Sequence, residues 1–178
     1  PDTPAATAIA ESLEYVWACS AFAADACLRD EGLLEWLATQ GRLLEPADAA
    51  WYAQMADAVT LPGSHDDAVF MSALRIFRRR QLVRIAWRDL AGYAPIEQVL
   101  AELSWLADAC INVASRQAAA LLGARHGVPK DRNGVELPLL VLGMGKLGGG
   151  ELNFSSDIDL VFLFAEHGET TGPRPLEH

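Results

Sequence analysis

The chain has 178 residues, of which 51% are hydrophobic, and its formal net charge is −10 at pH 7. This length suits one domain, or a small domain with part of another, and the hydrophobic content exceeds that of disordered chains. The acidic balance argues against general nucleic-acid binding, which needs a basic surface, and the lack of a long apolar run argues against a membrane-spanning helix.

The amino terminus and the cysteines bear on where the protein works. The first residues, PDTPAATAIAESLEY, lack the basic start and the unbroken apolar stretch of a secretory signal. The three cysteines are widely spaced and match no zinc or redox motif, which suits a reducing compartment. We therefore expect a cytoplasmic protein with no membrane partner.

Helical patterns occupy most of the sequence before residue 130. Thr3 is suited to cap the first helix, with Pro4 at its first position, and Ser64 is suited to cap a later one. Gly41 and Gly92 follow the ends of two predicted helices, as glycines commonly do. Apolar residues at helical spacing predict five helices, over residues 4–28, 30–39, 46–59, 64–91 and from 95 to beyond 122.

One predicted helix, residues 64–91, is rich in arginine. Arg80, Arg84 and Arg88 are spaced four residues apart and therefore form one stripe, opposite an apolar face. This pattern favours a solvent-exposed face that pairs with some of the many acidic residues. The alternative is a surface that packs against a catalytic domain or approaches a substrate phosphate.

A polar segment, KDRNGVE at residues 130–136, separates the helices from the rest of the chain. It contains an Asn-Gly turn, and we interpret it as the linker between a helical domain of residues 1–130 and a second domain of residues 131–178. In the second domain, residues 138–164 read PLLVLGMGKLGGGELNFSSDIDLVFLF. They predict an apolar strand, a glycine-rich turn and another apolar strand.

Two aspartates open the second predicted strand. Asp157 and Asp159 are two residues apart, so strand periodicity projects both carboxylates from the same face. Neighbouring carboxylates repel each other unless a cation lies between them, and a glycine-rich turn offers backbone N–H groups to phosphate oxygens. A divalent metal beside a bound phosphate is the equipment of a nucleotidyl-transfer site.

The candidate site combines these groups. We expect Asp157 and Asp159 to be catalytic and to bind one or two Mg²⁺ ions, because carboxylates and substrate phosphates together favour this metal. Six further residues are expected to bind the phosphates of a nucleotide, ADP or ATP, and inorganic phosphate: Gly145, Lys146, Gly148, Gly149, Ser155 and Ser156.

Three other interpretations of this stretch were weighed. Gly143, Gly145 and Gly148 match the dinucleotide fingerprint G-x-G-x-x-G, but too few residues follow for the crossover helix that this fold needs. A P-loop needs lysine after its last glycine, and Gly149 stands there instead. In the third interpretation, the two aspartates are ordinary polar residues at the end of a strand. That interpretation is less specific, because it leaves out the glycine-rich turn before them and the apolar strand after them.

The run GMGKLGGGELNFSSDIDLVF, residues 143–162, closely resembles the signature of the glutamine synthetase adenylyltransferase / adenylyl-removing enzyme family, within the nucleotidyltransferase superfamily. Residues 74–90, LRIFRRRQLVRIAWRDL, resemble the helical region of the same family. The family has two catalytic domains, and the sequence of this motif resembles the amino-terminal one, which removes the adenylyl group. The implied fold is mainly α: an amino-terminal helical bundle, then the start of an α+β nucleotidyltransferase domain with an incomplete sheet.

The resemblance also implies a function. The amino-terminal domain of the family removes AMP from an adenylylated tyrosine of glutamine synthetase, taking up phosphate and releasing ADP, under the influence of a PII-type signal protein. A carboxy-terminal domain adds AMP from ATP. The superfamily uses a third carboxylate, which the resemblance places beyond residue 178, so we expect this piece to be inactive alone. Two alternatives stay open: a non-catalytic helical docking or regulatory module, and an adenylylating, ATP-using domain.

Overall fold

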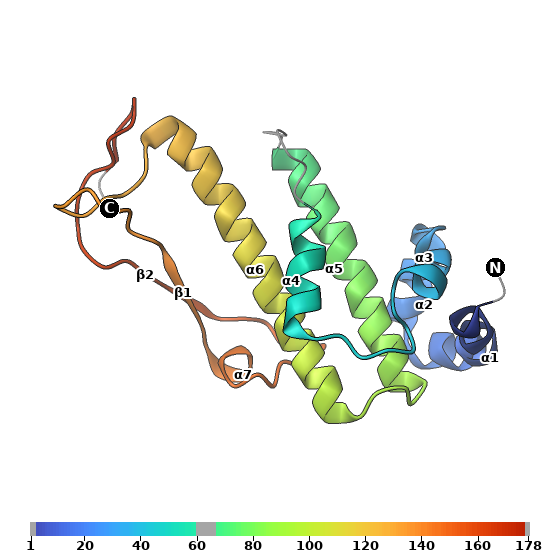
Figure 1. Ribbon diagram of the computed structural model, residues 1–178. Helices are drawn as coiled ribbons and strands as arrows, with labels where there is room; N and C mark the ends of the chain where they lie inside the picture. Colours follow the sequence, from blue (N-terminus) through green and yellow to red (C-terminus); the bar gives the residue numbers. More distant parts are fainter. Residues whose placement is uncertain (1–2, 60–66, 177–178) are drawn as a thin grey trace.

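The computed structural model describes residues 3–59 and 67–176 and is mainly helical, as the sequence predicts. Figure 1 shows the helices side by side, with a two-stranded hairpin beside the longest of them. The predicted cap Ser64 lies outside the described residues. The elements in chain order are α1 (Pro4–Cys19), α2 (Ala21–Arg29), α3 (Leu33–Thr39), α4 (Ala49–Asp57), α5 (Asp67–Leu90), α6 (Ile96–His126), β1 (Leu140–Gly143), α7 (Gly145–Gly148) and β2 (Leu160–Leu163).

The first predicted helix, residues 4–28, is wrong as a single element. Thr3 caps α1 as predicted, because its hydroxyl oxygen accepts from the Ala6 N–H at 3.1 Å. Ser20, however, has an extended backbone, and its hydroxyl accepts from the Ala23 N–H at 3.2 Å. A serine that offers its side chain to the next turn favours a helix start over a helix interior. The chain therefore breaks at Ser20 into α1 and α2.

The other helix boundaries differ from the prediction by a few residues. Asp48, not Pro46, precedes α4, and its carboxylate accepts from the Trp51 N–H at 2.8 Å. Gly92 has a φ of 71° beyond the end of α5, and Gly127 has a φ of 83° beyond the end of α6. These left-handed conformations suit glycine and explain why the helices end there.

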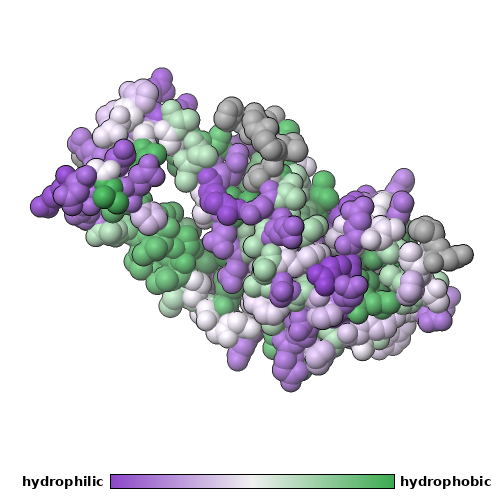
Figure 2. All heavy atoms as spheres, viewed as in Figure 1, coloured by the Kyte–Doolittle hydropathy of each residue, from purple (hydrophilic) through white to green (hydrophobic). Residues whose placement is uncertain are grey.

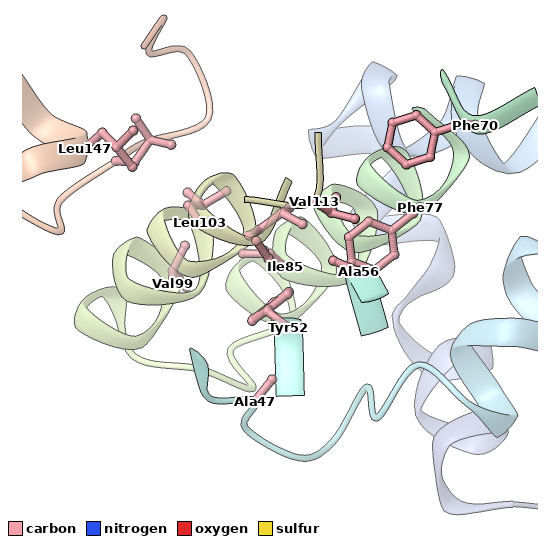
Figure 3. Close-up of a cluster of buried hydrophobic side chains, with 13 residues drawn as sticks. Ala47, Tyr52, Ala56, Phe70, Phe77, Ile85, Val99, Leu103, Val113 and Leu147 are labelled. Atoms are coloured by element: carbon pink, nitrogen blue, oxygen red, sulfur yellow. The ribbon is translucent and has the colours of Figure 1, made fainter. Parts of the chain in front are cut away.

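Two hydrophobic clusters hold the helices together, and α5 contributes to both. The first joins α4, α5 and α6 through side chains such as Tyr52, Phe77 and Leu103, shown in Figure 3. The second joins α1, α2 and α3 to α5, where Val83 and Trp87 are fully buried. Because α5 lies between two clusters, its apolar residues do not fall on one simple stripe.

The predicted solvent-exposed arginine face is wrong. Arg84 and Arg88 are almost completely buried, and both form ion pairs with the buried carboxylate of Glu102 on α6. Arg80 is half-buried and donates to both carboxylate oxygens of Asp30, at 2.7 and 2.8 Å. The hydrogen bond from Arg80 holds the pKa of Asp30 below its usual value. The stripe therefore faces the interior of the helical region, because its charges find partners there.

The predicted linker forms a tight turn. Lys130 and Glu136 form an isolated antiparallel bridge, and Gly134 takes a φ of 82°. The Asp131 carboxylate accepts from the backbone N–H of Val135 at 2.7 Å. Whether this turn separates two domains stays a prediction.

The two strands form an antiparallel hairpin in which Leu140 pairs with Leu163 and Gly143 pairs with Leu160. Figure 2 shows a hydrophobic surface at this side of the molecule. A sheet of two strands is marginal by itself, so the exposed apolar side chains fit the expectation of an incomplete sheet. These side chains are Leu140, Leu142, Val161, Phe162 and Leu163. Within the described ranges, no helix is both long and apolar enough to cross a membrane.

Candidate functional site

The predicted glycine-rich turn between the strands contains one short helical turn, α7. The strands on either side of it are antiparallel, and residues 149–159 contain no helix. A dinucleotide-binding crossover joins parallel strands through a full helix, so this arrangement excludes that interpretation of the glycines. The short bend delivers the chain directly to Asp157 and Asp159.

Close packing explains the glycine at position 148. A Cβ atom on Gly148 would lie 2.4 Å from the Gly143 carbonyl oxygen, a separation that side chains do not reach. A Cβ on Gly149 would meet only carbonyl oxygens at 3.6 and 3.7 Å, which is ordinary contact. The turn is therefore folded tightly onto the end of β1 at Gly148, and not at Gly149.

The backbone amides of the turn divide into two groups. The N–H groups of Gly148 and Gly149 donate to the carbonyls of Met144 and Gly145, at 3.3 and 3.1 Å. Those of Gly145 and Lys146 lie at the start of α7, where a helix offers no acceptor of its own. These two amides lie at the front of the turn, on the same short helix as the exposed Lys146 side chain.

The two candidate serines point to a common acceptor. The hydroxyls of Ser155 and Ser156 both donate to the side-chain oxygen of Asn153, at 3.2 and 2.7 Å. Asn153 also accepts through its backbone carbonyl from the Ser156 N–H at 3.2 Å. Asn153 thus holds the two serines together in the bend just before the aspartates.

Asp157 and Asp159 are exposed and precede β2, which begins at Leu160 rather than at Asp157 as predicted. The Asp159 carbonyl accepts from the Met144 N–H at 2.9 Å, so the pairing of the hairpin continues by one residue. In the part of the chain that the structure describes, no Lys, Arg or His side chain lies within ion-pair distance of either carboxylate. That both carboxylates point to the same side stays a prediction.

The chemistry of this pair fits magnesium, which prefers carboxylate oxygens. Among residues 3–59 and 67–176, no group of three or more His, Cys, Asp or Glu side chains is arranged to hold a metal. Magnesium binding by this pair therefore stays a prediction, in which Asp157 and Asp159 would be two of the ligands.

The glycine-rich segment is attached to α6, which sequence reasoning missed. Leu147 and Leu152 are buried in the first hydrophobic cluster, and Figure 3 shows Leu147 directed toward α6. The Leu152 N–H donates to the hydroxyl oxygen of Ser104 on α6, at 3.1 Å. No local pattern in the sequence indicates this contact, because Leu152 lies 48 residues beyond Ser104 along the chain.

We expect Gly148→Ala in the full-length protein to disrupt the turn, because the new methyl group collides with backbone that cannot move independently. Overpacking of this kind costs about 1–3 kcal/mol. Hydrogen exchange of the amides in residues 143–160 should become faster, and the midpoint of thermal unfolding should fall. Gly149→Ala is the matched control and should change neither, since its φ is −83° and its surroundings have room. Equal effects of the two substitutions would contradict this packing.

The sequence was compared with known proteins. A model of the glutamate-ammonia ligase adenylyltransferase family matches residues 10–177. The chain is 46% identical over 168 residues to a protein of Thioalkalivibrio sulfidiphilus (strain HL-EbGR7), covering 94% of the chain and 17% of that protein. It is 51% identical over 114 residues to one of Shewanella loihica (strain ATCC BAA-1088 / PV-4), covering 64% and 12%. Both relatives are named bifunctional glutamine synthetase adenylyltransferase/adenylyl-removing enzyme.

Proposed function

The chain belongs to the glutamate-ammonia ligase adenylyltransferase family, and from that premise we propose that residues 143–160 form part of its adenylyl-removing site. The chain spans less than a fifth of the length of the two relatives, so the activity of the whole protein is part of the proposal. The substrate would be adenylylated glutamine synthetase, and the regulator a PII-type signal protein in the cytoplasm. We assign residues 1–130 to a helical domain and residues 131–178 to the start of the catalytic domain.

The observation that carries the proposal is the exposed aspartate pair at the end of a short bend from the glycine turn. Neither carboxylate is neutralised by a cation among the described residues, so both are open to a metal. The bend also brings the chain from Lys146 and the first amides of α7 back to the same end of the hairpin, where the Met144 N–H donates to the Asp159 carbonyl. This arrangement supports a site in which a phosphate group would bind next to a metal ion.

The proposed reaction is a phosphorolysis. An oxygen of inorganic phosphate forms a bond to the phosphorus of the AMP group, and the bond from that phosphorus to the tyrosine oxygen breaks. The products are ADP and the free tyrosine, whose oxygen takes up a proton. Lys146 and the N–H groups at the front of α7 would bind phosphate oxygens, while Asp157 and Asp159 hold magnesium. When bound, magnesium supplies positive charge that stabilises the entering and leaving oxygens.

We expect Lys146→Met in the full-length protein to raise the KM for inorganic phosphate roughly tenfold or more, because a charge-assisted hydrogen bond contributes about 1.5–3 kcal/mol. The assay measures the ADP that forms when adenylylated glutamine synthetase is incubated with the protein and inorganic phosphate in the absence of ATP. Lys130→Met is the matched control, since Lys130 is the only other lysine in the chain and lies in the linker turn.

The same assay separates the alternatives. If the wild-type protein releases no ADP from adenylylated glutamine synthetase, the adenylyl-removing proposal is wrong. If Lys146→Met impairs only the addition of AMP from ATP, this domain works in the adenylylating direction. If it impairs neither reaction, the region is a docking or regulatory module rather than a catalytic one.

A further inference from the structure

The middle of α6 is buried on more than one side. Three consecutive residues, Glu102, Leu103 and Ser104, are each no more than 3% exposed. Consecutive helix residues point about 100° apart, so the directions of these three side chains span about 200°, slightly more than half of the circumference of the helix. Glu102 meets the arginines of α5, and Ser104 meets the segment that follows α7. The helix is therefore enclosed between the helical region and the glycine-rich segment.

Ser104 makes two hydrogen bonds in this position. Its hydroxyl donates to the Leu100 carbonyl one turn earlier, at 2.9 Å, and its oxygen accepts from the buried Leu152 N–H at 3.1 Å. A buried backbone N–H without an acceptor is costly, and the Ser104 oxygen is the acceptor that the structure provides. The first bond fixes the direction of the hydroxyl, so its lone pairs are held ready for Leu152.

Leu152 lies between the two halves of the proposed site. The Glu151 N–H just before it donates to the Lys146 carbonyl at 2.8 Å, and Asn153 just after it gathers the two serines. Asp157 follows a few residues later. The segment that connects the glycine-rich turn to the aspartates is thus tied to α6 by the hydrogen bond from the Leu152 N–H to Ser104, together with the apolar contacts of Leu147 and Leu152.

From this we infer that Ser104 is a positioning residue for the proposed adenylyl-removing site. It sets the place of residues 150–153 and, through them, the distance between the phosphate bound at α7 and the aspartate pair. This inference rests on the proposed function for its catalytic part. The anchoring itself does not, because the hydrogen bond and the burial stand without any activity. A helix serine that only satisfies its own helix would not need the second bond.

The test uses Ser104→Ala in the full-length protein. Alanine is the best helix former, so the variant is expected to fold. Loss of the acceptor leaves the Leu152 N–H unpaired, and exchange of that amide should be roughly tenfold faster or more. The kcat for phosphorolysis should fall about tenfold, while the KM for phosphate should change less than about twofold, because misplaced groups impair the reaction more than binding. Ser104→Thr keeps the hydroxyl and should restore most of the kcat.

A matched control is available on α1. The Ser12 hydroxyl also donates to the carbonyl one turn earlier, at Ala8, and also accepts an N–H, from the Trp87 indole at 2.8 Å. Ser12→Ala and Ser104→Ala should therefore lower the unfolding midpoint by similar amounts. Ser12→Ala should leave the exchange of the Leu152 amide and the kcat unchanged. If Ser104→Ala behaves like Ser12→Ala, or Leu152 exchange stays at the wild-type rate, the inference is wrong. If the wild-type protein shows no phosphorolysis, the proposed function fails, and the exchange rates still decide the anchoring.

Discussion

Replacing Asp157 and Asp159 with asparagine in the full-length protein is expected to lower the phosphorolytic release of AMP by more than about 100-fold. Replacing a residue that hydrogen-bonds to a metal ligand already lowers metal affinity or activity about 10–100-fold. Asp157 and Asp159 are the proposed ligands themselves, so a larger loss is expected. Asparagine keeps the size of each side chain but removes its charge, so magnesium loses two anionic ligands. Since both side chains are exposed and form no ion pair in the described ranges, folding should be little affected.

Three measurements check this result. The unfolding midpoint of the variant should match that of the wild type, which separates lost chemistry from lost structure. Raising the magnesium concentration should recover part of the activity of each single variant, because weaker binding is then offset by mass action. Glu169→Gln, an exposed acid beyond β2, is the control and should keep full activity. Wild-type rates in the double variant would show that the aspartate pair is not catalytic.

The second large effect is the loss of thermal stability that we expect from Glu102→Gln. Glu102 is a buried acid that forms ion pairs with both Arg84 and Arg88, and it also accepts from the Tyr52 hydroxyl at 2.9 Å. Removing its charge leaves two buried guanidinium groups without a counter-charge, which costs about 3–5 kcal/mol. For a chain of this size the unfolding midpoint should fall on the order of 10 °C.

The pH dependence of stability offers a second readout of the same site. Burial by itself would raise the pKa of Glu102, but the charge of Arg84 and the hydrogen bonds from Gln98 and other donors outweigh it, so the pKa is lowered from 4.5. A carboxyl group whose pKa is depressed on folding stabilises the protein above the unfolded pKa and loses that contribution as the pH falls through the folded pKa. Wild-type stability should therefore decline below about pH 4.5, and Glu102→Gln should show a shallower decline.

The control for this variant is Glu97→Gln, an exposed acid in the first turn of the same helix. It removes one charge near the positive end of the helix dipole, which is worth about 0.3–1 kcal/mol. A similar midpoint for the two variants, or an unchanged acid profile for Glu102→Gln, would mean that the buried ion pairs do not hold the helices together.

Local signals in the sequence were enough to predict many of the secondary-structure elements of this protein. Residues such as Thr3 and Gly92 act on the turn in which they stand, so the cap and the helix end that they predict can be found without a structure. The same holds for the hairpin, because the few residues between Gly148 and Asp157 leave no room for a crossover helix. The break at Ser20 is a limiting case, since a serine is favoured at a helix start but is also tolerated within a helix, so the residue type alone does not fix the break.

The order of the residues therefore determined by itself the helical class, the antiparallel hairpin, and the presence of a glycine turn followed by two aspartates. Only the tertiary structure decided that the arginine stripe is buried and that Ser104 holds the glycine-rich segment. The physical reason is that both depend on a partner distant along the chain. Arg84 is stable in the interior because it pairs there with Glu102 of α6 and donates to the carbonyls of Gly41, Arg42 and Glu45. The Ser104 oxygen has a role only because Leu152 approaches it. Periodicity reports which residues share a helix face, but it carries no information about what that face will meet.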